Sequence, residues 1–154
     1  MMKQKQSNGY LVNKNPVRHM DTILKNQYVT IYIDRTKLLI NDVWNTTSAV
    51  MSSDDFKDIL YTWKNCIIEN RLNKALIDAR KMAYLVAPEM QTWIAENINE
   101  PAQKAGLRQV ATILPSGVFE KVALTQTMKE FQQNQSFQRQ VFANELLAKD
   151  WLQL

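Results

Sequence analysis

The sequence predicts an α/β fold, in which a mixed sheet of four to five strands is covered by helices in the order β-β-α-β-α-β-α-β-α. Three observations lead to this class. Residues 28–33 alternate apolar and polar side chains, and a short turn leads to a second strand-like segment, 37–44. Residues 74–80 contain a short apolar run, as expected of a central strand covered on both faces. Segments with apolar residues at helical spacing precede and follow that run.

The first two strands are expected to form an antiparallel hairpin. Val29, Ile31 and Ile33 share one face of segment 28–33, and residues 34–36 are the predicted turn into segment 37–44. Residues 22–24 are a candidate short edge strand. Each later strand follows a crossover helix, so those strands should be parallel.

The first long helix is predicted to begin at Ser52, whose side chain can cap it, with Asp55 three residues later. Residues 70–73 are expected to end this helix before the central strand begins. Its predicted buried stripe consists of Phe56, Ile59, Leu60, Trp63, Ile67 and Ile68.

Residues 82–86 form an apolar connection after the central strand, and Pro88 is predicted at the first position of the next helix. Pro101 should break or kink that helix, and Gly106 should end it with a left-handed cap.

The last third of the chain is expected to add two strands and two helices. The strands are residues 108–114 and the more polar segment 137–142, which belongs at a sheet edge. Ser116 is predicted to cap the helix between them, and Asn144 a terminal helix. The first of these helices is expected to carry Phe119, Val122, Ala123, Met128 and Phe131, and the second to dock through Leu147, Ala148 and Trp151.

The positive charge is concentrated near the N-terminus. The chain of 154 residues has a net charge of +4 and a sequence pI of about 9.2. Residues 1–25 hold five basic residues and one acidic residue, whereas the remainder holds 14 of each. A nucleic-acid-binding domain should carry its basic patch on the folded body, so no nucleic-acid partner is expected. We predict a flexible basic leader over residues 1–21 and a single domain over 22–154.

The sequence also bears on the compartment. No apolar run approaches the length of a membrane span, the first residues lack the apolar core of a signal peptide, and there is a single cysteine, Cys66. The expectation is a cytoplasmic protein without integral membrane association.

Short segments of this chain share a pattern with a known family. They are Tyr28-Val29-Thr30-Ile31 with Trp44 at the end of the hairpin, Ala75-Leu76-Ile77-Asp78-Ala79-Arg80, Trp93-Ile94, Ala105-Gly106-Leu107-Arg108-Gln109-Val110-Ala111, Leu114-Pro115, Phe142, and Ala148 with Trp151-Leu152. From about residue 28 to residue 152 the chain resembles the SpoIIAA-like group of the STAS and SEC14 (CRAL-TRIO-like) superfamily. Many bacterial members of this group have no assigned function.

The resemblance implies two roles. Anti-anti-sigma STAS proteins bind a partner kinase and are switched by phosphorylation of a serine at the start of the helix after the central strand. Residues 85–89 of this chain, Leu-Val-Ala-Pro-Glu, contain no serine or threonine, so that switch is not expected. CRAL-TRIO relatives carry lipids in an apolar pocket, but they are larger than this chain.

The residues give little support for catalysis. His19 is the only histidine and lies in the predicted leader, so a nucleophilic mechanism that uses histidine lacks an ordered base. A His/Cys metal site lacks ligands for the same reason. The three glycines are too far apart for a phosphate loop, and Cys66 falls near the buried stripe of a helix. We therefore predict no catalytic residues, no metal and no cofactor.

Two groups of residues form the candidate binding surface. Asp78 and Arg80 end the central strand, where open α/β sheets bind ligands, and Ser116 follows the next strand. The alternative is that Asp78 and Arg80 pair with neighbours and Ser116 only caps its helix. Met82, Tyr84 and Leu85 belong to the apolar connection, which marks a partner surface if exposed and core if buried.

The sequence does not determine the function. The interpretation that we favour is a non-enzymatic regulatory or protein-interaction module that resembles STAS proteins but lacks the phosphorylatable serine. Its partner would be another protein, and a homodimer stays open. The alternative is a binder or carrier of a small apolar or acyl ligand held between sheet and helices.

Overall fold

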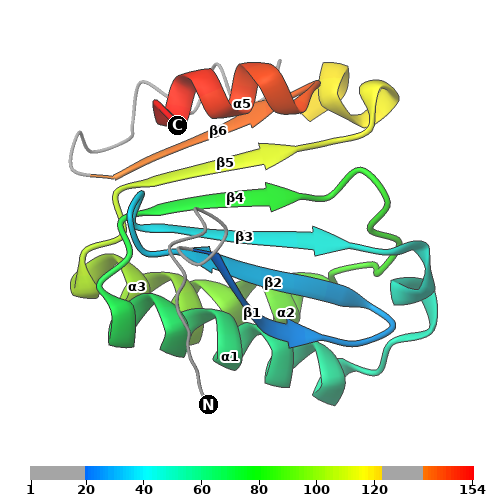
Figure 1. The fold of residues 1–154 in the computed structure, drawn as a ribbon. Coiled ribbons are helices and arrows are strands. Elements are labelled where there is room, and N and C mark those ends of the chain that lie inside the picture. The colour runs from blue at the N-terminus through cyan, green and yellow to red at the C-terminus, as the bar shows by residue number, and fades with distance from the viewer. Residues whose placement is uncertain (1–19, 123–136) are drawn as a thin grey trace, which may run out of the picture.

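The computed structural model describes residues 20–122 and 137–154, which form a six-stranded mixed sheet with helices on both faces (Figure 1). The strands lie side by side in chain order, from β1 at one edge to β6 at the other. They are β1 (Met20–Lys25), β2 (Val29–Asp34), β3 (Leu39–Trp44), β4 (Lys74–Asp78), β5 (Gln109–Ile113) and β6 (Gln138–Phe142). The predicted α/β class is confirmed.

The helices divide between the two faces of the sheet. Helices α1, α2 and α3 cover one face, and α5 packs on β4, β5 and β6 from the other (Figure 1). A further helical segment covers 116–122, at the limit of the described residues. The named helices are η2 (Thr46–Val50), α1 (Ser53–Asn70), α2 (Pro88–Ile94), the π-helical turn η3 (Ala95–Asn99), α3 (Glu100–Ala105) and α5 (Glu145–Leu152).

The sheet has one more strand than the four to five predicted, because the candidate edge strand forms. β1 pairs antiparallel with β2 through a bulge between Thr22 and Leu24. It begins at Met20, two residues before the predicted start of the domain; the rest of the predicted leader lies outside the described residues.

The predicted hairpin is confirmed. β2 and β3 pair antiparallel, and Val29, Ile31 and Ile33 are fully buried, as the alternation indicated. The Asp34 side chain accepts hydrogen bonds from the amides of Thr36 and Lys37, so it holds the turn.

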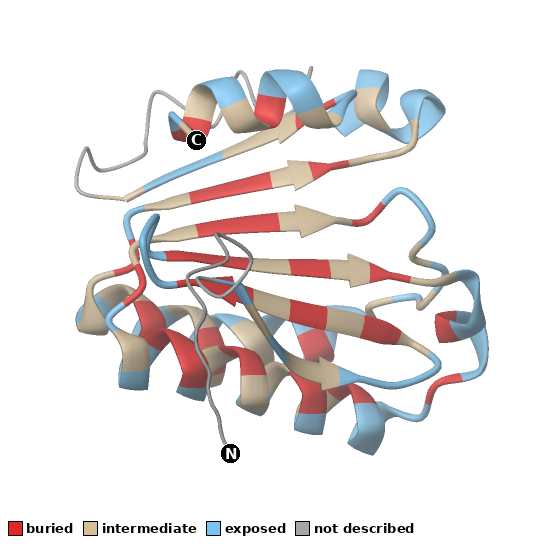
Figure 2. Cartoon of the chain, viewed as in Figure 1, coloured by how far each residue is buried: buried red, intermediate tan, exposed pale blue. Residues whose placement is uncertain are grey.

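The predicted parallel half of the sheet is also confirmed. β4 lies between β3 and β5 and is parallel to both, and β6 is parallel to β5 at the edge. Ala75 and Leu76, adjacent in β4, are buried in two different core clusters, one on each face of the sheet. Buried positions accordingly run through the middle of the sheet, with exposed residues on the outer faces of the helices (Figure 2).

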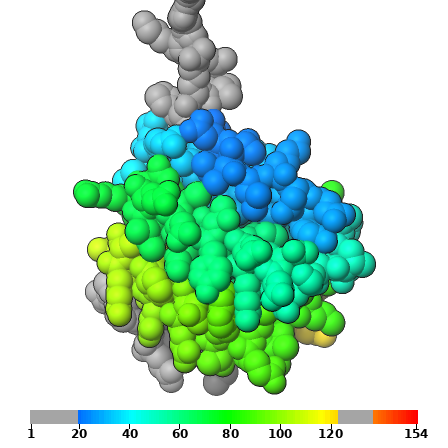
Figure 3. All heavy atoms as spheres, turned by 90° about the horizontal axis from the view of Figure 1, so that it is seen from below, coloured from blue at the N-terminus to red at the C-terminus, as the bar shows by residue number. Residues whose placement is uncertain are grey.

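Helix α1 begins as predicted, with the Ser52 side chain accepting a hydrogen bond from the Asp55 amide. Phe56, Ile59, Trp63 and Ile67 are buried against the sheet. The prediction for Ile68 is wrong: its side chain is 41% exposed, because it follows Ile67 by one residue and therefore lies about 100° further round the helix. Viewed from below, α1 runs between β1 and the α2–α3 segment (Figure 3).

The sequence predicted a break or a kink at Pro101, and the break does not occur, because helical residues continue from 88 to 105. Helix α2 begins at Pro88 as predicted, widens into the π-helical turn η3, and continues as α3 through Pro101 to Gly106, which has a positive φ of 125°. Proline lacks an amide proton and clashes with the carbonyl four residues before it in a regular α-helix. In this helix the widened turn ends directly before the α3 segment that contains Pro101, so the chain accommodates the proline without a break.

The predicted cap at the start of the terminal helix is confirmed, and two details of this region are corrected. Asn144 caps α5 by accepting from the Leu147 amide, but the Leu147 side chain is exposed and Leu152 is buried in its place. The amides of Val118 and Phe119 both donate to the Pro115 carbonyl, so Pro115 occupies the cap position predicted for Ser116. The predicted Ala123, Met128 and Phe131 lie outside the described residues.

Candidate functional site

The most distinctive feature of the molecule is a cavity of about 260 Å³ between the sheet and the helices that cover its first face. Its walls are mostly apolar. Helix α1 contributes Phe56, Ile59, Leu60 and Trp63, the α2–η3 segment contributes Ile94 and Ile98, and the sheet contributes Ile31, Ile77 and Val110. An engineered apolar cavity of about 150 Å³ is known to bind benzene, so this volume is large enough for a small organic ligand.

One acidic side chain, Asp42, lines the cavity deep in the core. Asp42 is only 3% exposed, and both of its oxygens accept hydrogen bonds from tryptophans. Nε1 of Trp44 lies 2.7 Å from Oδ2, and Nε1 of Trp63 lies 3.0 Å from Oδ1. Trp44 ends the same strand, whereas Trp63 lies on α1, so the carboxylate ties the helix to the sheet.

Asp42 is not neutralised by a basic side chain. Within residues 20–122 and 137–154 it takes part in no ion pair. Burial raises the pKa of Asp42 from 3.8 to about 7, the two indole hydrogen bonds oppose the rise, and the charge of Asp78 adds to it. A carboxyl group in an apolar pocket with so high a pKa is a candidate functional group.

The strand register sets the floor of the cavity. Asp42 of β3 is level with Ile77 of β4, Ile77 with Thr112 of β5, and Thr112 with Val141 of β6. This row places the Thr112 hydroxyl two strands away from the Asp42 carboxylate. Arg139 lines the cavity from the edge strand, with its guanidinium 5.6 Å from the Phe137 ring centre.

The π-helical turn supplies part of the opposite wall. Ile98 is buried, and both Ile98 and Asn99 line the cavity from η3. The wider turn bonds Glu100 back to the carbonyl of Ala95, five residues earlier, and so adds a residue to the turn beside the cavity. Such π turns are frequent at functional sites.

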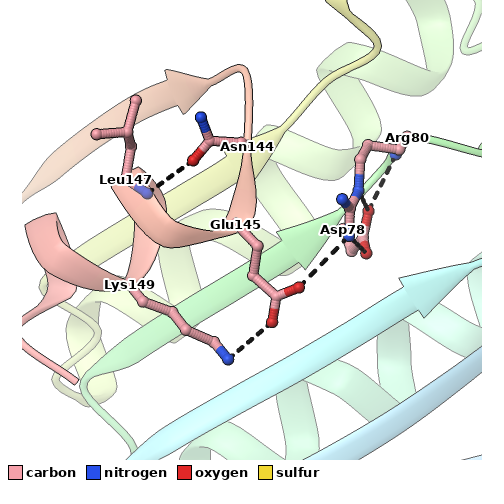
Figure 4. Close-up of polar contacts among 6 residues, drawn as sticks. All are labelled: Asp78, Arg80, Asn144, Glu145, Leu147 and Lys149. Carbon is pink, nitrogen blue, oxygen red and sulfur yellow. Dashed lines mark hydrogen bonds and ion pairs between the residues drawn. The ribbon is translucent and has the colours of Figure 1, made fainter.

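The predicted residues Asp78 and Arg80 meet at the end of β4, outside the cavity. Nε of Arg80 lies 2.9 Å from Oδ1 of Asp78, and Nη2 lies 2.7 Å from Oδ2. This bidentate ion pair holds the pKa of Asp78 below its usual value. Glu145 of α5 joins the network, 3.5 Å from Nη2 of Arg80 and 2.7 Å from Nζ of Lys149 (Figure 4).

The network favours the alternative that the sequence left open for Asp78 and Arg80, pairing with neighbours. In the part of the chain that is described, Ser116 makes no hydrogen bond or ion pair with Asp78 or Arg80. It is exposed at the start of segment 116–122.

The apolar connection divides into inward and outward residues. Met82, Tyr84 and Val86 are half-buried and pack against the core, with Tyr84 stacked on Phe56 at 4.4 Å between ring centres. Leu85 is 90% exposed. The buried Ser48 hydroxyl of η2 accepts from the Ala83 amide at 2.8 Å and anchors the segment. Of the three predicted apolar surface residues, Leu85 alone is largely open to solvent.

Asp42 was not among the residues that the sequence singled out. The signal was present, because residues 40, 42 and 44 share one face of strand 37–44 and Ile40 and Trp44 are both apolar. An acid between two such residues is expected to face the core. Its indole partners could not be identified, since Trp63 comes from a helix 21 positions later.

Comparison with protein-family models, curated proteins and solved structures gives no match to this chain. Across the described ranges, no group of acidic, histidine or cysteine side chains could hold a metal ion. The same ranges contain no helix with the length and hydropathy of a membrane span.

Proposed function

We propose that this protein binds or carries a small apolar ligand in the cavity between its sheet and helices. The observation that carries the proposal is the cavity itself: about 260 Å³, lined by aromatic and branched aliphatic side chains, with few polar groups. Ligand sites in proteins combine an apolar lining with a small number of placed polar groups. Asp42 and Thr112 supply such groups here.

The resemblance to the SpoIIAA-like group is compatible with this proposal. As part of this proposal we assign the SpoIIAA-like fold to the chain. The strands in chain order and the antiparallel β2–β3 hairpin support that assignment. The Asp78–Arg80 pair is occupied internally, and the pKa of Asp78 is lowered, so Asp78 is a poor general base at this corner of the sheet.

A second candidate is the regulatory or protein-interaction module. Leu85, which is 90% exposed and lies three residues before the start of helix α2, is the observation that favours it. Its half-buried neighbours Met82 and Tyr84 reduce the apolar area open to a partner, and for that reason we rank it second. Leu85→Ser should weaken association with such a partner without loss of stability.

The ligand proposal is tested by filling the cavity. Ile77→Phe adds ring atoms inside the cavity, so binding of ethylbenzene, measured by calorimetry or by quenching of tryptophan fluorescence, should fall at least about tenfold. Leu146→Phe, on the exposed outer side of α5, adds similar bulk and should leave binding unchanged. Equal binding of ethylbenzene to both variants contradicts the proposal, as does a failure of the unmodified protein to bind ethylbenzene or any other small aromatic probe.

A further inference from the structure

The cavity contains an uncompensated acceptor, and this determines which ligand chemistry suits it. Asp42 lies on the wall with both oxygens already accepting one indole hydrogen bond each. A carboxylate oxygen can accept more than one hydrogen bond, whereas an indole N–H can only donate. Trp44 and Trp63 therefore orient the carboxylate as an acceptor, and a ligand group that faces the ionised carboxylate is a donor.

The surroundings of Asp42 favour a cationic donor. Trp44, Phe56 and Trp63 all line the same cavity, and Trp44 and Phe56 are in ring contact at 5.9 Å between centres. Aromatic faces attract ammonium groups, and more strongly where water is excluded. A buried carboxylate without a partner is costly, and a cation that reaches it removes that cost. A carboxylate among aromatic side chains is complementary to an ammonium group.

We propose that the ligand of this cavity is a small primary amine, bound with its ammonium group on Asp42 beside Trp44 and Trp63 and its compact apolar body against α1 and the sheet. This inference rests on the proposed function and names the ligand class for the same site. The volume of about 260 Å³ fits an aromatic ring or a branched aliphatic group of similar size.

The charged groups around Asp42 allow this assignment. The cavity walls from β2, α1 and η3 present no charged side chain. Asp78 of β4 alternates to the other face of the sheet and acts on Asp42 as a second negative charge. Arg139 of β6 lines the cavity from the edge strand and could instead attract a ligand carboxylate, so the experiment includes an anionic probe.

The test compares probes of similar shape on the unmodified full chain: benzylamine, benzyl alcohol, ethylbenzene and benzoate. At pH 8 benzylamine should bind at least about tenfold more tightly than ethylbenzene, as expected for a hydrogen bond to a charged group. Because the ammonium requires ionised Asp42, with a pKa of about 7, its affinity should rise about 30-fold from pH 5.5 to pH 8. Ethylbenzene affinity should stay constant over this range.

Two variants separate the role of Asp42 from a general effect of charge. Asp42→Asn should abolish both the preference for benzylamine and its pH dependence, while ethylbenzene still binds. Asp78→Asn, which removes an aspartate on the other face of the sheet, should keep the preference for benzylamine and move its pH dependence only slightly to lower pH, because the Asp78 charge is the smallest of the causes that shift the pKa of Asp42. If the first variant does not fold, the pH series on the unmodified protein decides by itself.

The outcomes distinguish the two proposals. Tighter binding of ethylbenzene or benzoate than of benzylamine, or equal binding of all four probes, overturns the amine inference and leaves the cavity proposal standing. If none of the probes binds, both proposals fail.

Discussion

At the scale of the residue, Asp42 affects the stability of the fold and also lines the proposed ligand cavity. It is buried without a basic partner, and its hydrogen bonds come from two neutral indoles. In the unfolded chain the same carboxyl would titrate near 3.8, whereas burial raises the pKa in the folded protein to about 7. The folded state therefore binds a proton more tightly than the unfolded state does.

This difference predicts an unusual dependence of stability on pH. The contribution of Asp42 is fully present below about pH 4 and is lost as pH rises toward 7, at about 1.4 kcal/mol per pH unit in between. The free energy of unfolding, measured with urea, should fall from pH 5 to pH 7 in the unmodified protein. Asp42→Asn should flatten this slope, although the variant loses one of the two oxygen acceptors that the indoles of Trp44 and Trp63 use.

Asp78→Asn is the matched control for that measurement. The ion pair with Arg80 lowers the pKa of Asp78, so its stabilisation is lost only as pH falls below the ordinary range of aspartate. This variant should keep a falling stability between pH 5 and pH 7, with the upper end of the slope at slightly lower pH because the Asp78 charge no longer raises the pKa of Asp42. If Asp42→Asn keeps the slope as well, Asp42 is not the group responsible.

At the scale of the element, the segment between β4 and α2 depends on one side-chain anchor. Ser48 of η2 is fully buried, and its hydroxyl accepts the Ala83 amide. This bond joins two connections that are 35 positions apart in the sequence. It keeps Met82 and Tyr84 turned toward the core and Leu85 toward solvent.

Ser48→Ala should therefore destabilise the protein by about 1–2 kcal/mol, because the Ala83 amide loses its acceptor in a partly buried position. Amide exchange at Ala83 should speed up more than exchange in β4. Ser53→Ala, at an exposed position on the first turn of α1, is the control and should cost less than about 0.5 kcal/mol. Unchanged exchange at Ala83 in Ser48→Ala would show that the hydroxyl does not hold the segment.

Elements were predictable from the sequence where local pattern and tertiary packing agree. The alternation in 28–33, the cap at Ser52 and the proline at position 88 each correspond to a local rule, and each is confirmed. The π turn before Pro101 was not predictable, because a proline in a helical pattern signals a break and says nothing of a widened turn that accommodates it.

The candidate site was harder to predict than the fold. Sequence reasoning pointed to the end of the central strand, where Asp78 and Arg80 turn out to pair with each other and with Glu145. The cavity lies on the opposite face of the sheet from Asp78, and its acidic group depends on Trp63 from a helix and on a register that only the folded sheet defines. Contacts between distant segments of this kind leave no local pattern.

At the scale of the whole molecule, one sheet separates two hydrophobic cores. The larger core lies under α1, α2 and α3 and surrounds the cavity, and the smaller one lies under α5. The central strand contributes Ala75 to the first and Leu76 to the second. Because β4 belongs to both cores, loss of packing on one face should weaken the other, as in a single cooperative domain.

Two leucines of α5 allow a matched test of this coupling. Leu152 is fully buried in the smaller core, whereas Leu146 is 69% exposed on the same helix. Leu152→Ala should cost about 2–5 kcal/mol, the range for truncation of a buried leucine, and Leu146→Ala less than about 0.5 kcal/mol. β2 lies near the sheet edge opposite the strands on which α5 packs. If the domain is cooperative, the amides of β2 should lose as much exchange protection in Leu152→Ala as the amides of β5 do. A loss confined to β5, β6 and α5 would instead mean that the cavity side unfolds as a separate unit, and the cavity would then keep its ligand after the smaller core has opened.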